Sequence, residues 1–298
     1  MNENKKIRTL KSFFVNNISG WILILPSVIL FILLVWRPIV VGIGYSFFSL
    51  KGFTPQEFVG LKNFKDVLTD TNFLQTLWNT VQYVFWSLII GFPLPFICAF
   101  MINEMVRGKG FFKFTMYLPV IIPSIAVSMI WKFVYLGGEG GLINMLIYKL
   151  GISPVDWLSN KNLVIPLIIV SMTWNSFGST VILFLATMQG VNQELYDAAR
   201  LDGAGFFGRI NTVMMPYIKP TLVLMLIRQI IGVFNVTEQP LTMTGGGPNG
   251  ASMSIGLTNY FYAFKYGQND KSLALGVIVF IILLALTLVY NRLDKGMD

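Results

Sequence analysis

A polar segment between two long apolar runs combines charged and small side chains, and it is the most informative feature of this chain. In residues 194–216, charged groups stand among small ones and a proline ends the segment: Asp197, Ala198, Ala199, Arg200, Asp202, Gly203 and Pro216. Carboxylates and a guanidinium can form charge-assisted hydrogen bonds, and small side chains allow a second surface to approach closely. The chemistry indicated is the binding of another protein. The residues alone fit equally well an amphipathic connector on a membrane surface, in which Arg200 and Asp202 pair only with each other.

Catalysis and metal binding are disfavoured by the residues that the sequence lacks. It has no histidine, which removes the commonest general base and metal ligand, and its single cysteine, Cys98, lies within an apolar run. A histidine-based triad, a His-Glu-x-x-His zinc site and a thiolate cluster are therefore excluded. We predict neither a catalytic site nor a metal site, so the protein is not expected to be an enzyme.

The composition places the polar segment in a membrane protein. Hydrophobic residues make up 54% of the 298 positions and charged residues only 12%, with a mean hydropathy of +0.66. A chain this apolar cannot bury its surface in one soluble core, so its expected surroundings are a lipid bilayer. The formal net charge of +8 comes from short basic clusters beside the apolar runs, which is typical of membrane proteins and not of a nucleic-acid-binding surface.

Six apolar stretches are long enough to cross a bilayer. They lie near residues 20–48, 77–103, 114–136, 162–189, 219–243 and 271–291. About 20 helical residues span the hydrocarbon core, and an open strand would leave backbone groups unpaired in lipid. We expect an all-α integral membrane protein, with a segment 1–19 before the first span and a single membrane domain at 20–298. No clear cleavage site follows the basic N-terminal segment, so the first span is expected to be retained.

The basic clusters predict the orientation of the chain. Lysine and arginine concentrate before residue 12, in connectors 104–113 and 190–219, and after residue 291. Because cytoplasmic connectors carry the excess of these residues, both termini and the connector 190–218 are expected in the cytoplasm. On the opposite side, we expect a small helix within residues 49–76 and a second one at 142–150, after a glycine-rich turn.

Local signals in the connector 190–218 predict two short helices around a glycine. Asn192 is a typical N-cap residue. The three-and-four spacing then places four residues on one helix face: Leu195, Ala198, Ala199 and Asp202. Gly203 permits a left-handed turn at low steric cost, and a second segment begins shortly after it. Pro216 and Pro220 are expected to break the chain before the next span.

This connector closely resembles the EAA loop of binding-protein-dependent ABC importer permeases. In that family the pattern is Glu-Ala-Ala, a glycine four residues after the last alanine, and an Ile-x-Leu-Pro ending. The matching residues here are Tyr196-Asp-Ala-Ala-Arg-Leu-Asp-Gly-Ala-Gly205, then Val213, Met215 and Pro216. Asp197 replaces the glutamate, while valine and methionine replace the isoleucine and leucine. These replacements keep the charge and the apolar character.

The resemblance extends over most of the chain. Sugar-type permeases have an external segment and a second-span entry that resemble Val59-Gly-Leu-Lys-Asn-Phe-Lys65 and Asn79-Thr80 here. Their third span resembles the segment with Leu118-Pro119 and Pro123. The turn after their fifth span resembles the Thr-Gly-Gly-Gly-Pro-Asn-Gly run at 244–250. Together these segments are similar to the MalF/MalG-like branch, which moves carbohydrates. The resemblance implies a type I ABC importer permease (MetI/MalF-like) fold of six transmembrane helices with cytoplasmic termini.

The resemblance also implies partners. Permeases of this family work as multi-pass subunits in the bacterial cytoplasmic membrane, together with a second permease subunit, two ATPase subunits and an extracytoplasmic solute-binding protein. In the sugar branch the second permease is expected to be a different chain. No Gly-x-x-x-x-Gly-Lys-Ser/Thr sequence occurs, so no cofactor is expected in this chain, and ATP and Mg would be bound by the ATPase partners. The loop around residues 197–203 would couple their motion to the spans.

Polar side chains inside the fourth and fifth spans are the candidates for a sugar pathway. They are Trp174, Asn175 and Ser176 in the fourth span and Arg228, Gln229, Asn235, Glu238 and Gln239 in the fifth. From these we select as pathway residues Trp174, Asn175, Asn235, Glu238 and Gln239, because a carbohydrate requires hydrogen-bonding groups and aromatic faces. Arg228 and Glu238 are too far apart along one helix to pair. Contact with the second permease or with lipid headgroups is the alternative for both.

Two other function classes fit the sequence less well. An ion-gradient-driven secondary transporter would require acidic residues near the membrane midplane, whereas the acidic residues here lie mostly in connectors. A membrane enzyme would require clustered histidine or carboxylate groups at the membrane edge. The secondary transporter therefore stands as the alternative to the importer.

Overall fold

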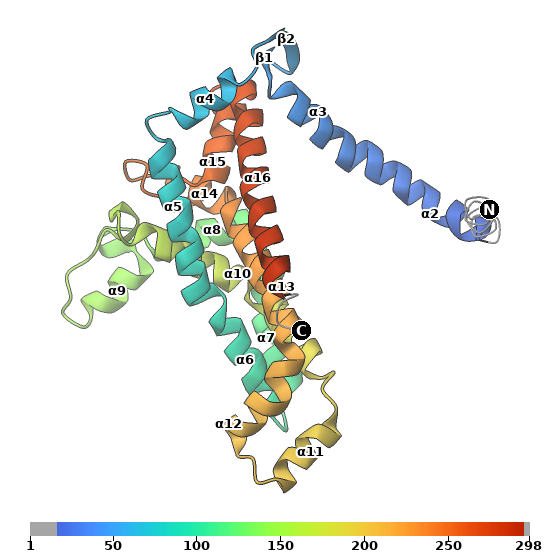
Figure 1. Ribbon diagram of the computed structural model, residues 1–298. Coiled ribbons are helices and arrows are strands. Elements are labelled where there is room, and N and C mark those ends of the chain that lie inside the picture. Colours follow the sequence, from blue (N-terminus) through green and yellow to red (C-terminus); the bar gives the residue numbers. More distant parts are fainter. Residues whose placement is uncertain (1–16, 295–298) are drawn as a thin grey trace, which may run out of the picture. The chain divides into compact units, whose positions relative to one another are not determined.

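The computed structural model describes residues 17–294 (Figure 1). Most of the segment 1–19 that was expected before the first span lies outside the described residues. The described chain divides into two compact units. One unit contains the residues up to Leu68 together with Gly267–Ile281, and the other contains Thr69–Tyr266 together with the residues from Ile282 on.

The membrane-spanning helices expected from hydropathy are present. Among the described residues, five helices are long and apolar enough to cross a membrane, and one bent pair brings the number up to six. The five are Ile18–Tyr45, Phe73–Glu104, Val164–Met188, Ile210–Phe234 and Asn269–Leu288, and the bent pair is Lys109–Ile121 with Ser124–Val134. The structure is therefore mostly helical, as the sequence predicts.

The first span is one continuous helix whose apolar side chains are exposed. It consists of α2 (Ile18–Phe31), a π-helical turn (Ile32–Trp36) and α3 (Arg37–Tyr45). A helix that is apolar on every side is suited to lipid contact. A two-stranded antiparallel sheet follows, made of β1 (Phe48–Lys51) and β2 (Thr54–Phe58), and then α4 (Lys62–Leu68). The prediction for residues 49–76 was thus incomplete, because it contained a helix but no strands.

Helix α10 (Val164–Met188) is the central element of the larger unit. It packs against α5 (Phe73–Trp86), α6 (Pro93–Glu104), α7 (Lys109–Ile121) and α13 (Met215–Phe234). Its buried side chains contribute to two apolar clusters, one around Ile165 and Ile168 and one around Phe184 and Leu185. At Gly178 the helix approaches α7 so closely that an added Cβ would overlap the Met116 carbonyl oxygen. Glycine is required there because no side chain fits.

The third span, expected near residues 114–136, is broken into two helices. Helices α7 and α8 (Ser124–Val134) meet at an angle of 95°. Pro123 explains the break, because a residue before proline is forced out of the helical region and Ile122 is extended, with φ −78° and ψ 130°. Asn175 of α10 donates to the Pro119 carbonyl oxygen at 2.8 Å, which binds the end of α7 to the central helix.

The fifth span is shorter than expected at one end and longer at the other. Helix α13 ends at Phe234, not near residue 243, and a separate helix α14 (Glu238–Thr244) follows. Pro240 has no N–H group to donate to the Val236 carbonyl oxygen, which instead accepts a hydrogen bond from the Ser254 hydroxyl. At the other end, a π-helical turn (Ile210–Met214) leads directly into α13. The expected break at Pro216 and Pro220 is therefore wrong, because Pro216 lies in the first turn of α13 and Pro220 is accommodated inside it.

Buried polar side chains of α5 hold the glycine-rich loop that follows α14. Asn79 donates to the carbonyl oxygens of Gly250 and Met253, at 2.7 and 3.0 Å, and Tyr83 donates to that of Ser252 at 3.0 Å. The loop ends at α15 (Ile255–Tyr260), followed by a π-helical turn (Phe261–Lys265) and α16 (Asn269–Asp294). Inside a membrane such polar groups require partners, and the loop carbonyls provide them.

The connector between α8 and α10 contains the helix expected at 142–150, here α9 (Leu142–Tyr148), between the 3₁₀ turns Gly138–Gly140 and Trp157–Ser159. Its fully buried Asn144 donates to the carbonyl oxygens of Leu136, Gly138 and Val155 and accepts from Trp157 Nε1. One side chain therefore fixes the path of the whole connector.

Candidate functional site

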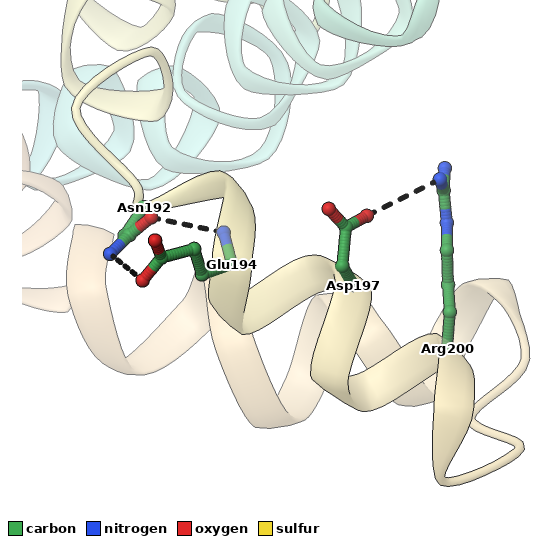
Figure 2. A network of polar contacts seen from close by, with 4 residues as sticks. All are labelled: Asn192, Glu194, Asp197 and Arg200. Atoms are coloured by element: carbon green, nitrogen blue, oxygen red, sulfur yellow. Dashed lines mark hydrogen bonds and ion pairs between the residues drawn. The ribbon is translucent and has the colours of Figure 1, made fainter.

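The loop at 190–218 forms the two predicted short helices, α11 (Gln193–Leu201) and α12 (Phe206–Arg209). Both lie at one end of the larger unit (Figure 1). Asn192 caps α11 as expected. Its Oδ1 accepts from the Glu194 backbone N–H at 2.9 Å, and its Nδ2 donates to the Glu194 carboxylate at 3.3 Å (Figure 2). The cap satisfies a backbone donor that would otherwise lack a partner at the helix start.

The ion pair in α11 is not the pair between Arg200 and Asp202 that the sequence alone allowed as an alternative. Arg200 lies 3.7 Å from the Asp197 carboxylate, one turn earlier on the same helix, and not against Asp202 (Figure 2). Both side chains are 58% exposed. An exposed pair of this kind contributes only about 0.2–1 kcal/mol, so a partner protein could take over either charge at little cost.

Gly203 adopts the left-handed conformation that the sequence predicts, with φ +77°. Nothing lies within 4 Å of a Cβ built at this position, so the requirement for glycine comes from the backbone and not from crowding. The turn ends α11 through hydrogen bonds from the Gly203 and Ala204 N–H groups to the carbonyls of Arg200 and Ala199. It leaves Leu195 and Leu201 exposed, at 53% and 90%. Apolar side chains exposed beside charged ones are suited to a protein partner.

A cavity of about 630 Å³ lies between α10, α13, α14 and the π-helical turn Ser87–Gly91 of the second span. Four of the five residues selected as the pathway line it: Asn175, Asn235, Glu238 and Gln239. Arg228 and Gln229, considered with them, also line it. Because the helix breaks after Phe234, Glu238 returns toward the cavity on a separate element, where its carboxylate accepts the Ser124 hydroxyl at 2.6 Å.

Trp174 is the exception among the selected pathway residues. Trp174 does not line the cavity. Its ring lies edge-on to that of Trp131, with the ring centroids 6.0 Å apart. A helix turns by about 100° per residue, so Trp174 points away from the direction of its neighbours at 173 and 175.

Several cavity residues were missed from the sequence. Thr173, Ser179 and Thr180 were not among the candidates, and they line the cavity along α10 together with Ser176, which was. They recur with helical spacing on one face, and this polar stripe in an apolar helix was a signal that could have identified them. Gly91 could not have been found, because its role is to leave room: a Cβ there would lie 2.9 Å from the Gln229 amide nitrogen. Among the described residues, no cluster of three histidine, cysteine or carboxylate side chains is arranged to hold a metal ion.

Known proteins are similar to this chain over nearly its whole length. The arabinooligosaccharides transport system permease protein AraP of Bacillus subtilis is 30% identical over 289 residues, 95% of this chain and 90% of AraP. The trehalose/maltose transport system permease protein MalF of Thermococcus litoralis is 30% identical over 277 residues, 93% of each chain. The sulfoquinovosyl glycerol transport system permease protein SmoG of Agrobacterium fabrum is 28% identical over 281 residues, 93% of this chain and 90% of SmoG.

The fold is shared with a solved structure. A chain in the crystal structure of a bacterial ABC transporter involved in the import of the acidic polysaccharide alginate superposes with a TM-score of 0.85 over 97% of this chain and 99% of that one, at 22% identity. This likeness establishes the ABC importer permease fold that the motifs implied. The family model of the binding-protein-dependent transport system inner membrane component matches residues 91–298. The chain therefore belongs to the family of inner membrane components of binding-protein-dependent transport systems.

Proposed function

We propose that this protein is a permease subunit of an ATP-driven ABC importer that takes its substrate from a solute-binding protein. The observation that carries the proposal is helix α11, an exposed helix at the ends of the spans that is closed by the left-handed Gly203 turn. A helix with exposed Leu195, Ala198 and Asp202 and a weak internal ion pair has the features of a docking element. Membership of the family supports the same interpretation.

In the proposed importer, this chain and a second, different permease subunit form the translocation pathway in a bacterial cytoplasmic membrane. Two ATPase subunits would bind the α11 loops on the cytoplasmic side, where both termini would also lie. These subunits would hold ATP and Mg, with no cofactor in this chain. Closing of the ATPase pair would move α11 and shift the spans between inward-open and outward-open states, provided that its contacts differ between the two states. An extracytoplasmic binding protein would deliver the substrate.

We further propose that the substrate is a carbohydrate. The 630 Å³ cavity has walls of hydroxyl, amide and charged side chains, which can hydrogen-bond to sugar hydroxyl groups. Several relatives are named for oligosaccharide transport, among them the AraP and MalF proteins described above. This chain is also similar to a chain in the crystal structure of a bacterial alginate ABC transporter in complex with a periplasmic protein that binds an alginate pentasaccharide.

The test is substrate uptake into proteoliposomes that contain this chain with its co-expressed second permease and ATPase subunits. Radiolabelled arabino-oligosaccharides, maltose and trehalose are offered with the cognate binding protein, in the presence of ATP or of a non-hydrolysable analogue. A parallel set contains an ionophore that collapses ion gradients. We expect uptake that requires both ATP and the binding protein and is insensitive to the ionophore.

Uptake that persists without ATP and disappears with the ionophore would instead establish the ion-gradient-driven secondary transporter. ATP-dependent uptake of a non-sugar solute, with no uptake of any sugar, would retain the importer and exclude the carbohydrate assignment.

A further inference from the structure

A second cavity, of about 320 Å³, lies where the loop 190–218 meets the ends of the spans. Its walls come from the end of α6, the start of α7, the end of α10, and α11 with α12. The polar side chains that line it are Asn103, Glu104, Lys109, Gln189, Tyr196, Arg200 and Arg209. The transport mechanism proposed above assigns no role to this cavity.

The charges around this cavity are unbalanced. Three cations face it from three different helices, Lys109 from α7, Arg200 from α11 and Arg209 from α12, against the single carboxylate of Glu104. The Lys109 ammonium donates one hydrogen bond to the Asn103 carbonyl oxygen at 2.8 Å, which leaves its other N–H groups available. Arg200 shares its charge with Asp197 at 3.7 Å. An anion would reduce the repulsion among these groups and accept their hydrogen bonds.

The Tyr196 hydroxyl provides an independent indication of a ligand. It is buried at this cavity and has no hydrogen-bond partner in the described structure. Burial raises the pKa of Tyr196, the Glu104 charge raises it further and the Arg209 charge lowers it. The hydroxyl therefore keeps its proton at neutral pH and is available as a donor. A buried polar group without a partner destabilises the fold, and a ligand oxygen would relieve this cost.

The ligand must offer several acceptor oxygens around one compact negative charge. A phosphate group has this arrangement, and guanidinium groups bind it through paired hydrogen bonds. The cavity lies where α6, α10 and the spans on either side of them end, which is the depth of lipid headgroups in a bilayer. Basic pockets between membrane helices at this depth are suited to anionic headgroups.

We propose that this cavity binds a phosphate group, supplied by the headgroup of an anionic phospholipid or by free phosphate. Bound there, the phosphate joins α7 to α11 and α12, so that the loop is held in one position against the ends of the spans.

The test is native mass spectrometry of the delipidated full-length chain in neutral detergent, titrated with phosphatidylglycerol or with phosphatidylcholine. We expect Arg209→Gln and Lys109→Gln each to weaken phosphatidylglycerol binding about fivefold, because one basic residue near a membrane contributes about 1 kcal/mol. Tyr196→Phe, which keeps the shape of the ring, should weaken it less. Arg107→Gln is the matched control. Arg107 is an exposed cation in the connector between α6 and α7, two residues before Lys109, and is outside the lining of the cavity.

Glu104→Gln provides a test that misfolding cannot imitate, because removal of the one carboxylate at the cavity should strengthen phosphatidylglycerol binding. Millimolar inorganic phosphate then distinguishes the sources. Displacement of the lipid by phosphate identifies a site for the phosphate group itself, and binding that resists it identifies a headgroup site. Equal phosphatidylglycerol affinity in the wild type, Arg209→Gln and Glu104→Gln, or an equal loss in Arg107→Gln, would overturn the proposal.

Discussion

At the scale of single residues, the loop 190–218 depends on backbone conformation more than on side-chain contacts. Asn192 starts α11 with its cap, and Gly203 ends it with a φ of +77°. The pair between Asp197 and Arg200 is exposed and contributes little to stability. The position of the proposed docking residues is therefore set mainly by the helix ends.

Gly203→Ala is expected to impair coupling although there is space for its methyl group. A left-handed conformation costs a non-glycine residue about 1–2 kcal/mol, so the native turn would be populated less. If docking requires this turn, ATP hydrolysis stimulated by the binding protein should fall by about 5- to 30-fold in the assembled importer. Gly205→Ala is the matched control, because Gly205 has open space around it and is not among the glycines with positive φ. Equal activity of both variants would show that the turn is dispensable.

At the scale of the elements, helix α10 organises the larger unit by close packing and by polar contacts. Gly178 allows α7 to approach its backbone, and Asn175 donates to Pro119 at the end of α7. In a membrane the association of helices depends on packing and hydrogen bonds, since lipid supplies no hydrophobic driving force between them. The broken third span is thus supported from α10.

Gly178→Ala should destabilise the protein by forcing α7 away from α10. The added Cβ would lie 2.5 Å from the Tyr117 Cα, and backbone atoms cannot move aside as a flexible side chain can. Overpacking of this kind costs about 1–3 kcal/mol, which a lowered thermal unfolding midpoint in detergent would report. Gly232→Ala in α13 serves as the comparison, because nothing lies within 4 Å of its Cβ and alanine favours helix. An unfolding midpoint equal to wild type for Gly178→Ala would contradict this account of the contact.

At the scale of the whole molecule, the cavity of about 630 Å³ is the feature that several elements build together. Asn175 comes from α10, Arg228 from α13 and Glu238 from α14, and Ser124 at the start of α8 holds the glutamate. As the proposed substrate pathway, a cavity with such walls should recognise the hydroxyl groups of a sugar through individual hydrogen bonds.

Thr173→Val should raise the KM for uptake and leave kcat unchanged. The substitution keeps the shape of the side chain but removes a hydroxyl from the cavity wall, and a lost hydrogen bond of about 1 kcal/mol corresponds to about a fivefold change. Thr187→Val on the same helix is the control, because Thr187 donates to the Leu183 carbonyl oxygen and is outside the cavity lining. A similar change in both variants would indicate a general effect on α10 and not substrate contact.

The sequence by itself determined the features that depend on neighbouring residues. Hydropathy identified the spans, because crossing a bilayer requires a continuous apolar run whatever the remainder of the chain does. The cap at Asn192 and the turn at Gly203 followed from local backbone chemistry. The motif in the same loop identified the family. The role of the loop, the orientation of the termini and the boundaries of the membrane domain stay predictions.

Only the tertiary structure decided which polar side chains meet. Glu238 was expected to continue the fifth span, but α13 ends at Phe234, and the separate helix α14 brings the glutamate to Ser124, 114 positions away in sequence. Trp174 was selected for its chemistry, yet the rotation of α10 places it against Trp131. The basic cavity at Arg209 likewise combines residues of separate connectors. Convergence of this kind depends on packing between distant helices, and local sequence signals do not carry that information.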